Sequence, residues 1–425
     1  MSQSRNLRKT RAWVLHPDIK SDPSGRDARP ALDEAVSLAL ALPELEVVGS
    51  DVVRLSKPQA GMLFGSGKVA ELKSIFYDNE VELVLIDGPV TPVQQRNLEM
   101  KWSVKLLDRT GLILEIFSDR AATREGVLQV EMAALSYQRT RLVRAWTHLE
   151  RQRGGLGFVG GPGETQIEAD RRAIDLQLLK LRQQLAKVIK TRQLHRESRA
   201  KVPYPIVALV GYTNAGKSTL FNYLTGAEVM VKDMLFATLD PTMRSFKTKG
   251  GSEFILSDTV GFVSDLPTEL IAAFRATLEE VLNADIILHV RDISHSQSEG
   301  QSRDVLSILT NIGVPQDTRL FEVWNKVDQL SEDDLLRLTN RATRLENTFP
   351  LSALTGAGID KLISAVENEL NSQNFDDALN LTYHEGKKRA WLYDQGVVRN
   401  ETQTEDGFQF ALSWSTRQKT QFHLI

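Results

Sequence analysis

The stretch from 206 to 219 reads IVALVGYTNAGKST and constrains the fold more than any other part of the chain. Its first five residues are apolar or small, a length that suits a buried strand. The loop after them ends at Gly216, Lys217 and Ser218, where an amphipathic segment begins. This is G-x-x-x-x-G-K-[ST] in the strand, loop and helix order that a phosphate-binding loop requires. The motif predicts a nucleoside triphosphate site without naming the base.

The chemistry of this loop follows from its residue types. Glycines allow backbone N–H groups to converge on phosphate oxygens, and the start of the next helix favours an anion. Lys217 is expected to reach the β- and γ-phosphates, and Ser218 to ligate Mg²⁺. The residues predicted to surround the phosphates are Gly211, Tyr212, Thr213, Asn214, Ala215, Gly216, Lys217, Ser218 and Thr219.

The base is indicated by residues 320–328, LFEVWNKVD, an apolar strand that stops at N-K-x-D. The carboxylate of Asp328 can accept from both N1–H and the exocyclic amine of guanine, which adenine does not present together. Lys326 would pack its stem over the base, and Asn325 would brace the loop, with Val327 between them and the carboxylate. An isolated N-K-x-D is more often a polar turn, but its place downstream of the phosphate loop favours guanine. Asp328 also argues against ATP.

Two further motifs complete the set. Residues 254–261, FILSDTVG, form a strand that ends in D-x-x-G, with Thr259 and Val260 at the variable positions. Asp258 would hold Mg²⁺ through water, and the Gly261 amide would face the γ-phosphate. Ser352, Ala353 and Leu354 are similar to the S-A-[KL] turn whose backbone contacts the guanine oxygen. Four motifs in this order predict a GTP-hydrolysing domain over 201–371 that uses GTP and Mg²⁺.

The catalytic step is less well specified. Many GTPases carry a glutamine after D-x-x-G that orients the attacking water, and Phe262 holds that place here. Because an apolar ring cannot polarise water, intrinsic hydrolysis should be slow, with a partner supplying the missing group. The alternative is that Phe262 only packs in the core.

Composition sets outer bounds. A chain of 425 residues is long enough for two to four domains. Its net charge of −3 gives no chain-wide attraction to nucleic acid, so a basic surface must be local. The absence of cysteine fits a reducing cytosol. The polar first thirty residues and the lack of any run of eighteen apolar residues predict neither a signal peptide nor a transmembrane segment.

Before the phosphate loop, the chain alternates strand and helix patterns. We expect a disordered start over 1–10 and then an N-terminal α/β domain over 11–118 with a mostly parallel sheet. Gly65-Ser66-Gly67-Lys68 fails the phosphate-loop spacing and is better explained as a glycine turn before a helix, the alternative being a weak nucleotide or RNA contact. The expected strands are 13–15, 45–55, 81–87 and 104–107, the expected helices are 31–42, 67–78 and 91–101, and 18–30 is expected to be a loop.

Residues 119–200 predict a helical hairpin whose Gly-rich tip is 153–163, RGGLGFVGGPG. Apolar residues spaced by three and four predict a coiled-coil-like seam. The seam residues are Leu128, Met132, Leu135, Leu142, Trp146 and Leu149 in the first helix and Ile167, Ile174, Leu178, Leu181, Leu185 and Val188 in the second.

The hairpin is also locally basic, which suits RNA phosphates, with Phe158 at the tip available to stack on a base. An idle glycine linker is the alternative. The basic residues expected near the tip are Arg139, Arg141, Arg144, Arg151, Arg153, Arg171 and Arg172, and those along the second helix are Lys180, Arg182, Lys187, Lys190, Arg192, Arg196 and Arg199.

After the GTPase domain, 372–377 is polar and is expected to be a linker within a small C-terminal domain over 372–425. Weak alternation predicts two or three strands and a helix there. Lys387, Lys388 and Arg389 beside Trp391 are expected to form a solvated surface, the alternative being a ribosome contact.

Several stretches together are similar to HflX-type GTPases of the translation-factor-related class, over about residues 10–370. The resemblance is carried by DRTGLILEIFSDRAATREGVLQVEMA, RAWTHLERQRGGLGF, GPGETQIEADRR, GYTNAGKSTLFN, LFATLDPT and DTVGF. It implies a multidomain α/β fold, with a small α/β domain and a helical hairpin before the GTPase domain and a small α+β domain after it.

The resemblance also identifies the first switch segment. In FATLDPT, Thr238 matches the family's switch threonine, whose hydroxyl would ligate Mg²⁺ and whose amide would touch the γ-phosphate. Thr242 is a competing candidate. The neighbours expected to contribute to nucleotide binding are Phe236, Ala237, Leu239 and Asp240.

For function, the resemblance implies a monomer that binds the large ribosomal subunit in its GTP form, with the hairpin tip reaching ribosomal RNA near the peptidyl transferase centre. It further implies splitting or recycling of stalled or stressed ribosomes and release on GTP hydrolysis. The alternatives are a GTP-gated switch that recruits a protein partner and a large-subunit maturation factor. The implied location is the cytoplasm, on ribosomes, with a peripheral membrane association as an alternative.

Overall fold

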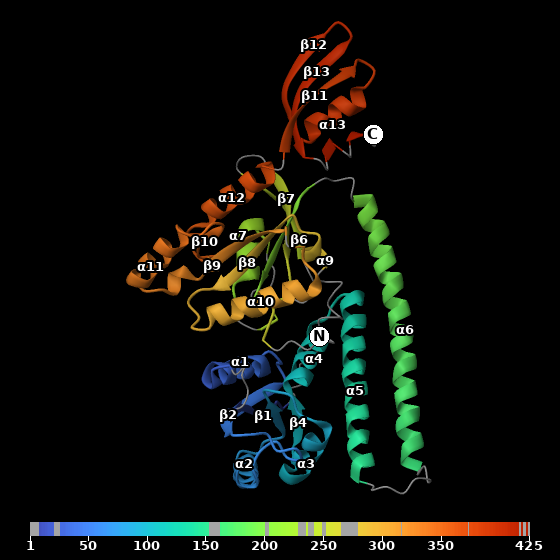
Figure 1. Ribbon diagram of the computed structural model, residues 1–425, viewed down its shortest axis with the longest axis vertical. Helices are drawn as coiled ribbons and strands as arrows, with labels where there is room; N and C mark the ends of the chain where they lie inside the picture. The colour runs from blue at the N-terminus through green and yellow to red at the C-terminus, as the bar shows by residue number, and fades with distance from the viewer. Residues whose placement is uncertain are drawn as a thin grey trace, which may run out of the picture. The chain divides into compact units, whose positions relative to one another are not determined.

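The computed structural model describes two compact units, labelled by their helices and strands in Figure 1. The first unit comprises 1–189 with 230–241 and 259–278, and the second comprises 190–229, 242–258 and 279–425. The structure describes residues 8–20, 26–152, 162–199, 204–227, 235–236, 242–248, 252–264, 279–315, 317–372, 374–415, 418–419 and 422–423.

The first unit contains a four-stranded parallel sheet of order β2-β1-β3-β4, which confirms the predicted α/β class. Apolar residues of the strands, such as Leu15 and Val84, pack with Phe76 and Trp102 from the helices. Strand order reverses between β1 and β3, so their carboxyl ends form a topological switch point. The elements are β1 (Thr10–Ile19), α1 (Ala28–Leu40), β2 (Leu45–Leu55), α2 (Ser66–Asp78), β3 (Leu83–Ile86), α3 (Pro92–Trp102), β4 (Lys105–Asp108) and α4 (Arg109–Arg120).

The first strand is longer than its sequence indicates. Thr10, placed in the disordered start, and Asp18 and Ile19, placed in a loop, all belong to β1. The reason is tertiary, because β1 pairs with β2 from Thr10 opposite Leu45 to Ile19 opposite Leu55. The predicted loop over 18–30 is therefore wrong at both ends, since α1 begins at Ala28. Residues 1–7 and 21–25 lie outside the described residues.

The predicted glycine turn before a helix is present, with Gly65 as the N-cap of α2. Lys68 lies in the first turn and donates to Glu71 Oε1 at 2.6 Å. It also lines a surface cavity of about 740 Å³ together with Arg29, Arg54 and Lys57. The nucleotide or RNA contact stays a prediction.

Two long helices, α5 (Arg124–Gln152) and α6 (Pro162–Arg199), form the predicted hairpin arms, and α5 packs against α3 and α4. Arg139 on α5 pairs with Asp175 on α6 at 3.0 Å. Leu178 is buried in an otherwise exposed stretch of α6, and Ile174, Leu181, Leu185 and Val188 of the expected seam are half-buried. The Gly-rich tip is shorter than expected, because Pro162 and Gly163 begin α6. Proline lacks a backbone N–H, and the first residue of a helix has no intrahelical partner for one, so proline is favoured there. The rest of the tip, 153–161, and its Phe158 lie outside the described residues.

One of the arginines expected near the tip has another role. Arg141 donates to Asp108 Oδ2 at 2.8 Å and also to Tyr137 and Gln95, so it joins α5 to the end of β4. Counting arginines along the sequence cannot reveal this pairing. Arg172 is also paired, with Glu168 at 2.7 Å, so the arms carry less unpaired positive charge than predicted. The side chains of Arg144, Arg151, Arg153, Arg192, Arg196 and Arg199 lie outside the described residues.

The second unit is built on a six-stranded sheet of order β10-β9-β8-β5-β7-β6, parallel except for β6. Buried residues such as Val207, Leu288 and Val323 form its core. Carboxyl ends of parallel strands share an edge of the sheet, and β5, β7 and β9 each end in a predicted motif. The elements are β5 (Ile206–Gly211), α7 (Lys217–Thr225), β6 (Thr242–Lys247), β7 (Glu253–Asp258), α9 (Glu279–Leu282), β8 (Ile286–Asp292), α10 (Ser298–Ile312), β9 (Arg319–Asn325), η1 (Val327–Gln329), α11 (Glu332–Ala342), β10 (Thr348–Pro350) and α12 (Ile359–Ser372).

The chain ends in a three-stranded antiparallel sheet of order β11-β13-β12 with one helix, around Phe410, Trp414 and Phe422. The expected linker over 372–377 is wrong, because β11 pairs with β13 from position 374 opposite position 415. No helix in the part of the chain that the structure describes is both long and apolar enough to cross a bilayer. The elements are β11 (Asn374–Thr382), α13 (Gly386–Asp394), β12 (Val398–Thr404) and β13 (Gly407–Ser415).

The basic triplet on α13 is largely neutralised by nearby acids. Lys388 donates to Glu385 at 2.8 Å, and Arg389 to Glu401 at 3.0 Å. These pairs favour the solvated surface over an RNA contact, and the ribosome contact stays a prediction.

A buried charged cluster lies at the switch point of the first unit. Asp87, directly after β3, contacts His16 Nδ1 at 2.8 Å, Arg109 Nη1 at 2.6 Å and Arg26 Nη2 at 3.2 Å. Burial alone would raise the pKa of Asp87, but the His16 hydrogen bond and the charges of Arg109 and Arg26 lower it to about 2. The folded state therefore favours the ionised carboxylate.

This depressed pKa predicts a loss of stability in acid. Because the folded pKa is the lower one, Asp87 stabilises the fold above its unfolded pKa near 3.8, and this contribution disappears as pH falls towards about 2. The contribution is about 2 kcal/mol. Unfolding by urea at several pH values should show a steeper acid loss for the parent than for Asp87→Asn. Identical pH dependence in the two would contradict this assignment.

Candidate nucleotide site

The candidate site lies at the carboxyl edge of the six-stranded sheet, where the loop after β5 makes close backbone contacts. Gly216 has a φ of +94°, and a Cβ there would lie 2.2 Å from Asn325 Nδ2. Gly211 has a φ of +153°, and its Cβ would lie 2.1 Å from the Val290 carbonyl oxygen. Glycine is therefore needed at both positions of the phosphate-loop motif, because a Cβ would collide with a neighbouring atom and because the positive φ disfavours other residues.

Asn325 joins the two ends of the site. Its Nδ2 donates to the Ala215 carbonyl at 2.8 Å, and its Oδ1 accepts from the Ala353 amide at 2.9 Å. The side chain is 2% exposed, so both bonds are shielded from water. The sequence predicts that Asn325 braces a loop, and the structure shows which two loops it connects.

Lys217 begins α7 and folds back over its own loop. Its Nζ donates to the carbonyls of Tyr212 at 2.8 Å and Gly211 at 3.1 Å. Burial lowers the pKa of Lys217 to about 8, with a partial opposing effect from Asp258. Negative phosphate charge placed beside this ammonium would stabilise its protonated form.

Next to it, Ser218 Oγ donates to Asp258 Oδ2 at 2.7 Å. A hydroxyl and a carboxylate together are oxygen ligands of the kind Mg²⁺ prefers, with phosphates and water filling the remaining positions. The donor set therefore fits the metal predicted for these two residues. Thr213 is buried in the same loop, and Asn214 adopts a positive φ of 58°.

The predicted base-recognition motif follows β9 as a tight turn. Lys326 has a left-handed φ of +65°, and its Nζ contacts Asp292 Oδ2 at 2.7 Å. Asp328 is exposed in η1, where a ligand can reach it, and Val327 is half-buried. Ser352 is buried, whereas Leu354 is 75% exposed. Sequence reasoning missed Asp292, although an acid at the end of a central parallel strand is a recognisable signal.

The segments predicted to respond to the γ-phosphate belong to the first unit. In this unit Phe236, Thr259 and Val260 are buried, and Gly261 has a buried backbone. Phe262, in the place of the missing glutamine, is 3% exposed, which favours its packing role. The competing Thr242 begins β6 opposite Asp258. Ala237, Thr238, Leu239 and Asp240 lie outside the described residues, so their assignment stays a prediction.

Comparisons with known proteins agree with the motif order. Family models match 29–118 as "GTP-binding GTPase N-terminal", 120–199 as "GTP-binding GTPase Middle Region", 206–326 as "50S ribosome-binding GTPase" and 337–422 as "HflX C-terminal domain". GTPase HflX of Magnetococcus marinus is 46% identical over 393 residues, which cover 92% of this chain and 89% of the relative. The chain belongs to the HflX family of GTPases.

The HflX resemblance predicted from sequence is thus confirmed, and with it GTP binding and hydrolysis. GTPase HflX of Escherichia coli is 43% identical over 350 residues, 82% of each chain. Among solved structures, a GTP-binding protein of Sulfolobus solfataricus in complex with GDP matches with a TM-score of 0.45 and 20% identity, over 85% of this chain and 98% of that one.

The lowered pKa of Lys217 predicts proton uptake when nucleotide binds. Near pH 8 the free ammonium is about half protonated, and the phosphates should raise its pKa, so binding should take up about half a proton. Calorimetry of GDP binding in buffers of different ionisation enthalpy measures this number. Lys217→Arg, whose cation does not titrate in this range, should show none. Equal uptake in both proteins would contradict the assignment.

Proposed function

We propose that this HflX-family GTPase requires Mg²⁺, binds the large ribosomal subunit in its GTP form, splits or recycles stalled ribosomes, and leaves after hydrolysis. The observation that carries the proposal is the family match over 206–326, described as a 50S ribosome-binding GTPase, with matching modules on both sides of it. Such a protein works as a monomer in the cytoplasm.

The hairpin arms supply the contact with RNA. On α6 the exposed side chains of Lys180, Arg182 and Lys190 follow one another along a helix with few acids. Arg139 and Arg172 are held in ion pairs on the arms. Basic side chains on an extended arm are suited to phosphate contacts, which position a protein without reading sequence.

The nucleotide site performs the chemistry through positioned charge. Ser218 and Thr238 directly, and Asp258 through water, would hold Mg²⁺, which would supply positive charge beside the phosphates. Lys217 binds the β- and γ-phosphates and the Gly261 amide contacts the γ-phosphate, while Asn325 keeps the phosphate and base loops at a fixed separation.

Hydrolysis by the isolated protein is slow in this account. Phe262 is buried and carries no group that can orient water, so the ribosome completes the catalytic arrangement. Contact with the large subunit should therefore raise turnover, and GTP hydrolysis then resets the protein to a weakly bound form.

Binding to purified large subunits tests this proposal. With a non-hydrolysable GTP analogue the protein should co-sediment, with GDP it should not, and the affinity should fall more than tenfold between about 50 and 200 mM salt. Lys180→Glu with Arg182→Glu should weaken binding. A switch that recruits a protein partner would instead fail to co-sediment with large subunits in either nucleotide state.

A matched control variant makes the same change of charge at positions outside the hairpin. Lys361→Glu with Arg344→Glu alters two exposed residues of the second unit that lie outside the hairpin. This variant should bind as the parent does. Equal weakening by both variants would show a general charge effect and contradict a specific role of the hairpin.

A further inference from the structure

The loop that follows β8 lies against the predicted base-recognition motif, and Asp292 makes the main contact between them. Asp292 is the last residue of β8 and is in register with Asn325, the last residue of β9. Its Oδ2 lies 2.7 Å from Lys326 Nζ in an ion pair. Beside this pair, the Ile293 amide donates to the Asn325 carbonyl at 3.1 Å. A side-chain contact and a backbone contact therefore join the end of β8 to the motif.

The second oxygen of Asp292 fixes the carboxylate in place. This oxygen, Oδ1, accepts from the Ser294 amide at 3.0 Å and from the Ser294 hydroxyl at 2.6 Å. The same hydroxyl lies 3.0 Å from Gln329 Oε1 at the end of η1. An aspartate that bonds the amide two residues on closes a tight turn of its own. The carboxylate therefore cannot rotate away from Lys326 without losing its bonds to Ser294.

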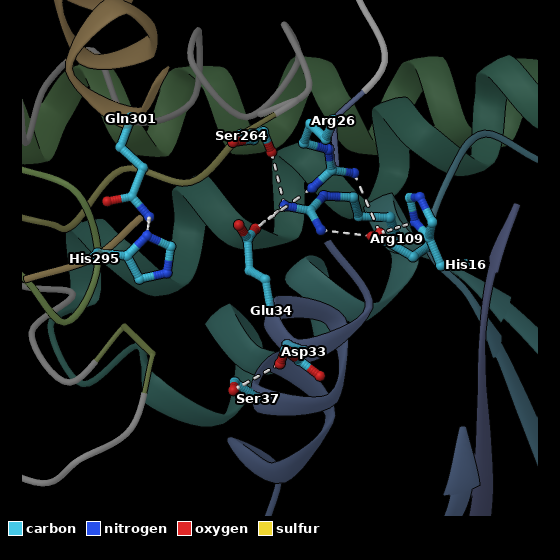
Figure 2. Close-up of polar contacts among 10 residues, drawn as sticks. His16, Arg26, Asp33, Glu34, Ser37, Arg109, Ser264, His295 and Gln301 are labelled. Carbon is cyan, nitrogen blue, oxygen red and sulfur yellow. Dashed lines mark hydrogen bonds and ion pairs between the residues drawn. The ribbon is translucent and has the colours of Figure 1, made fainter. Parts of the chain in front are cut away.

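Helix α10 holds this loop from its other end. His295 Nδ1 accepts from the Gln297 amide at 3.1 Å and lies 3.5 Å from Gln301 Nε2, a contact drawn in Figure 2. Gln301 belongs to α10, which packs against β5 and β8. The position of Asp292 is therefore set by the strand before it and by the helix after it.

Lys326 is ordered before any ligand is bound. Its φ of +65° lies in the left-handed region, which is disfavoured for lysine and persists only where neighbours hold it. The Lys326 side chain is 20% exposed and that of Asp292 is 14% exposed, so the ion pair is partly shielded from water. A free lysine side chain has many rotamers, and a ligand that packs on it must restrict them. Pairing with Asp292 makes part of this restriction in advance.

Asp328 is the acid that would otherwise attract Lys326. It lies two residues further along the turn and is exposed. Among the residues that the structure describes, its carboxylate has no hydrogen-bond or ion-pair partner. A lysine released from Asp292 would be drawn to this carboxylate, which is the group expected to accept from guanine. Holding Lys326 at Asp292 keeps the two charges of the motif apart.

We propose that Asp292 is a positioning residue for guanine recognition. It fixes the Lys326 ammonium, so that the lysine stem is set to cover the base and Asp328 stays free to accept from it. This role rests on the GTP-binding part of the proposed function, in which residues 325–328 hold guanine. Asp292 touches neither base nor phosphate in this scheme and acts through Lys326. Loss of its charge should therefore weaken guanine nucleotide binding and spare the phosphate end of the site.

A double-mutant cycle tests whether Asp292 acts through Lys326. Asp292→Asn removes the charge but keeps an oxygen for the Ser294 amide, and Lys326→Ala removes both ammonium and stem. Calorimetric titration with GDP should show affinity falling about fivefold for Asp292→Asn and about tenfold for Lys326→Ala. The double variant should match Lys326→Ala within about twofold, because no lysine is left to position. A double variant about fivefold weaker than Lys326→Ala would show a merely structural role and overturn the proposal.

Inorganic pyrophosphate separates a lost base contact from a damaged fold. It reaches only the phosphate loop, so its affinity for Asp292→Asn should stay within about twofold of the parent. A loss equal to that for GDP would show general damage to the site and contradict the positioning role. Asp292→Ser also keeps a short acceptor for the Ser294 amide, and it provides the same comparison should the Asn variant not fold.

Glu369→Gln is the matched control. It breaks another ion pair of the second unit, in which Glu369 Oε1 lies 2.8 Å from Arg319 Nε. Arg319 begins β9, at the end of the strand opposite to the motif. This variant should bind GDP as the parent does. Equal weakening in Glu369→Gln and Asp292→Asn would reflect the loss of any ion pair and would contradict a specific role of Asp292.

Lys326→Ala also separates failure of this proposal from failure of the base assignment. If Lys326→Ala weakens GDP binding and Asp292→Asn does not, Lys326 contributes to base binding and the positioning role of Asp292 alone is rejected. If Lys326→Ala binds GDP as the parent does, the assignment of this lysine to the base fails, and the role of Asp292 fails with it.

Discussion

The nucleotide site depends above all on the two hydrogen bonds of Asn325. One end of this amide holds the phosphate loop through the Ala215 carbonyl, and the other holds the base loop through the Ala353 amide. Since the side chain is buried, neither bond competes with water, and losing one would leave a buried polar group unsatisfied. Gly216 belongs to the same arrangement, because any side chain there would collide with Asn325. The phosphate and base ends of the site are thus set at one distance before any nucleotide arrives.

The parallel sheet of the second unit brings these loops together, whereas the predicted switch segments belong to the first unit. Asp258 ends a strand of the second unit, whereas Phe236 and residues 259–264 belong to the first unit, where Arg109 of α4 donates to the Ser264 carbonyl and Phe117 of α4 contacts the Phe236 ring.

Much of this architecture follows from local sequence patterns. The strand over Leu45–Leu55 and the strand ends that carry the GTPase motifs lie where apolar runs followed by polar or glycine residues predict them. The predictions were wrong at strand ends that are set by pairing with strands far away in the sequence. Only the partner strands show that β1 continues through Pro17 and that β11 starts at 374. Likewise, charge along a sequence could not tell that Arg141 pairs with Asp108 or that Arg109 reaches Ser264, 155 residues away.

The most direct test of the account concerns the base end of the pre-set site. Asp328→Asn exchanges a carboxylate for an amide that donates to the second oxygen of xanthine, while Asn325 and the phosphate loop stay untouched. Calorimetric titration with GDP and xanthosine diphosphate should show GDP affinity falling about a hundredfold and xanthosine diphosphate affinity rising above it. Unchanged GDP affinity in this variant would contradict the assignment of residues 325–328 to guanine recognition.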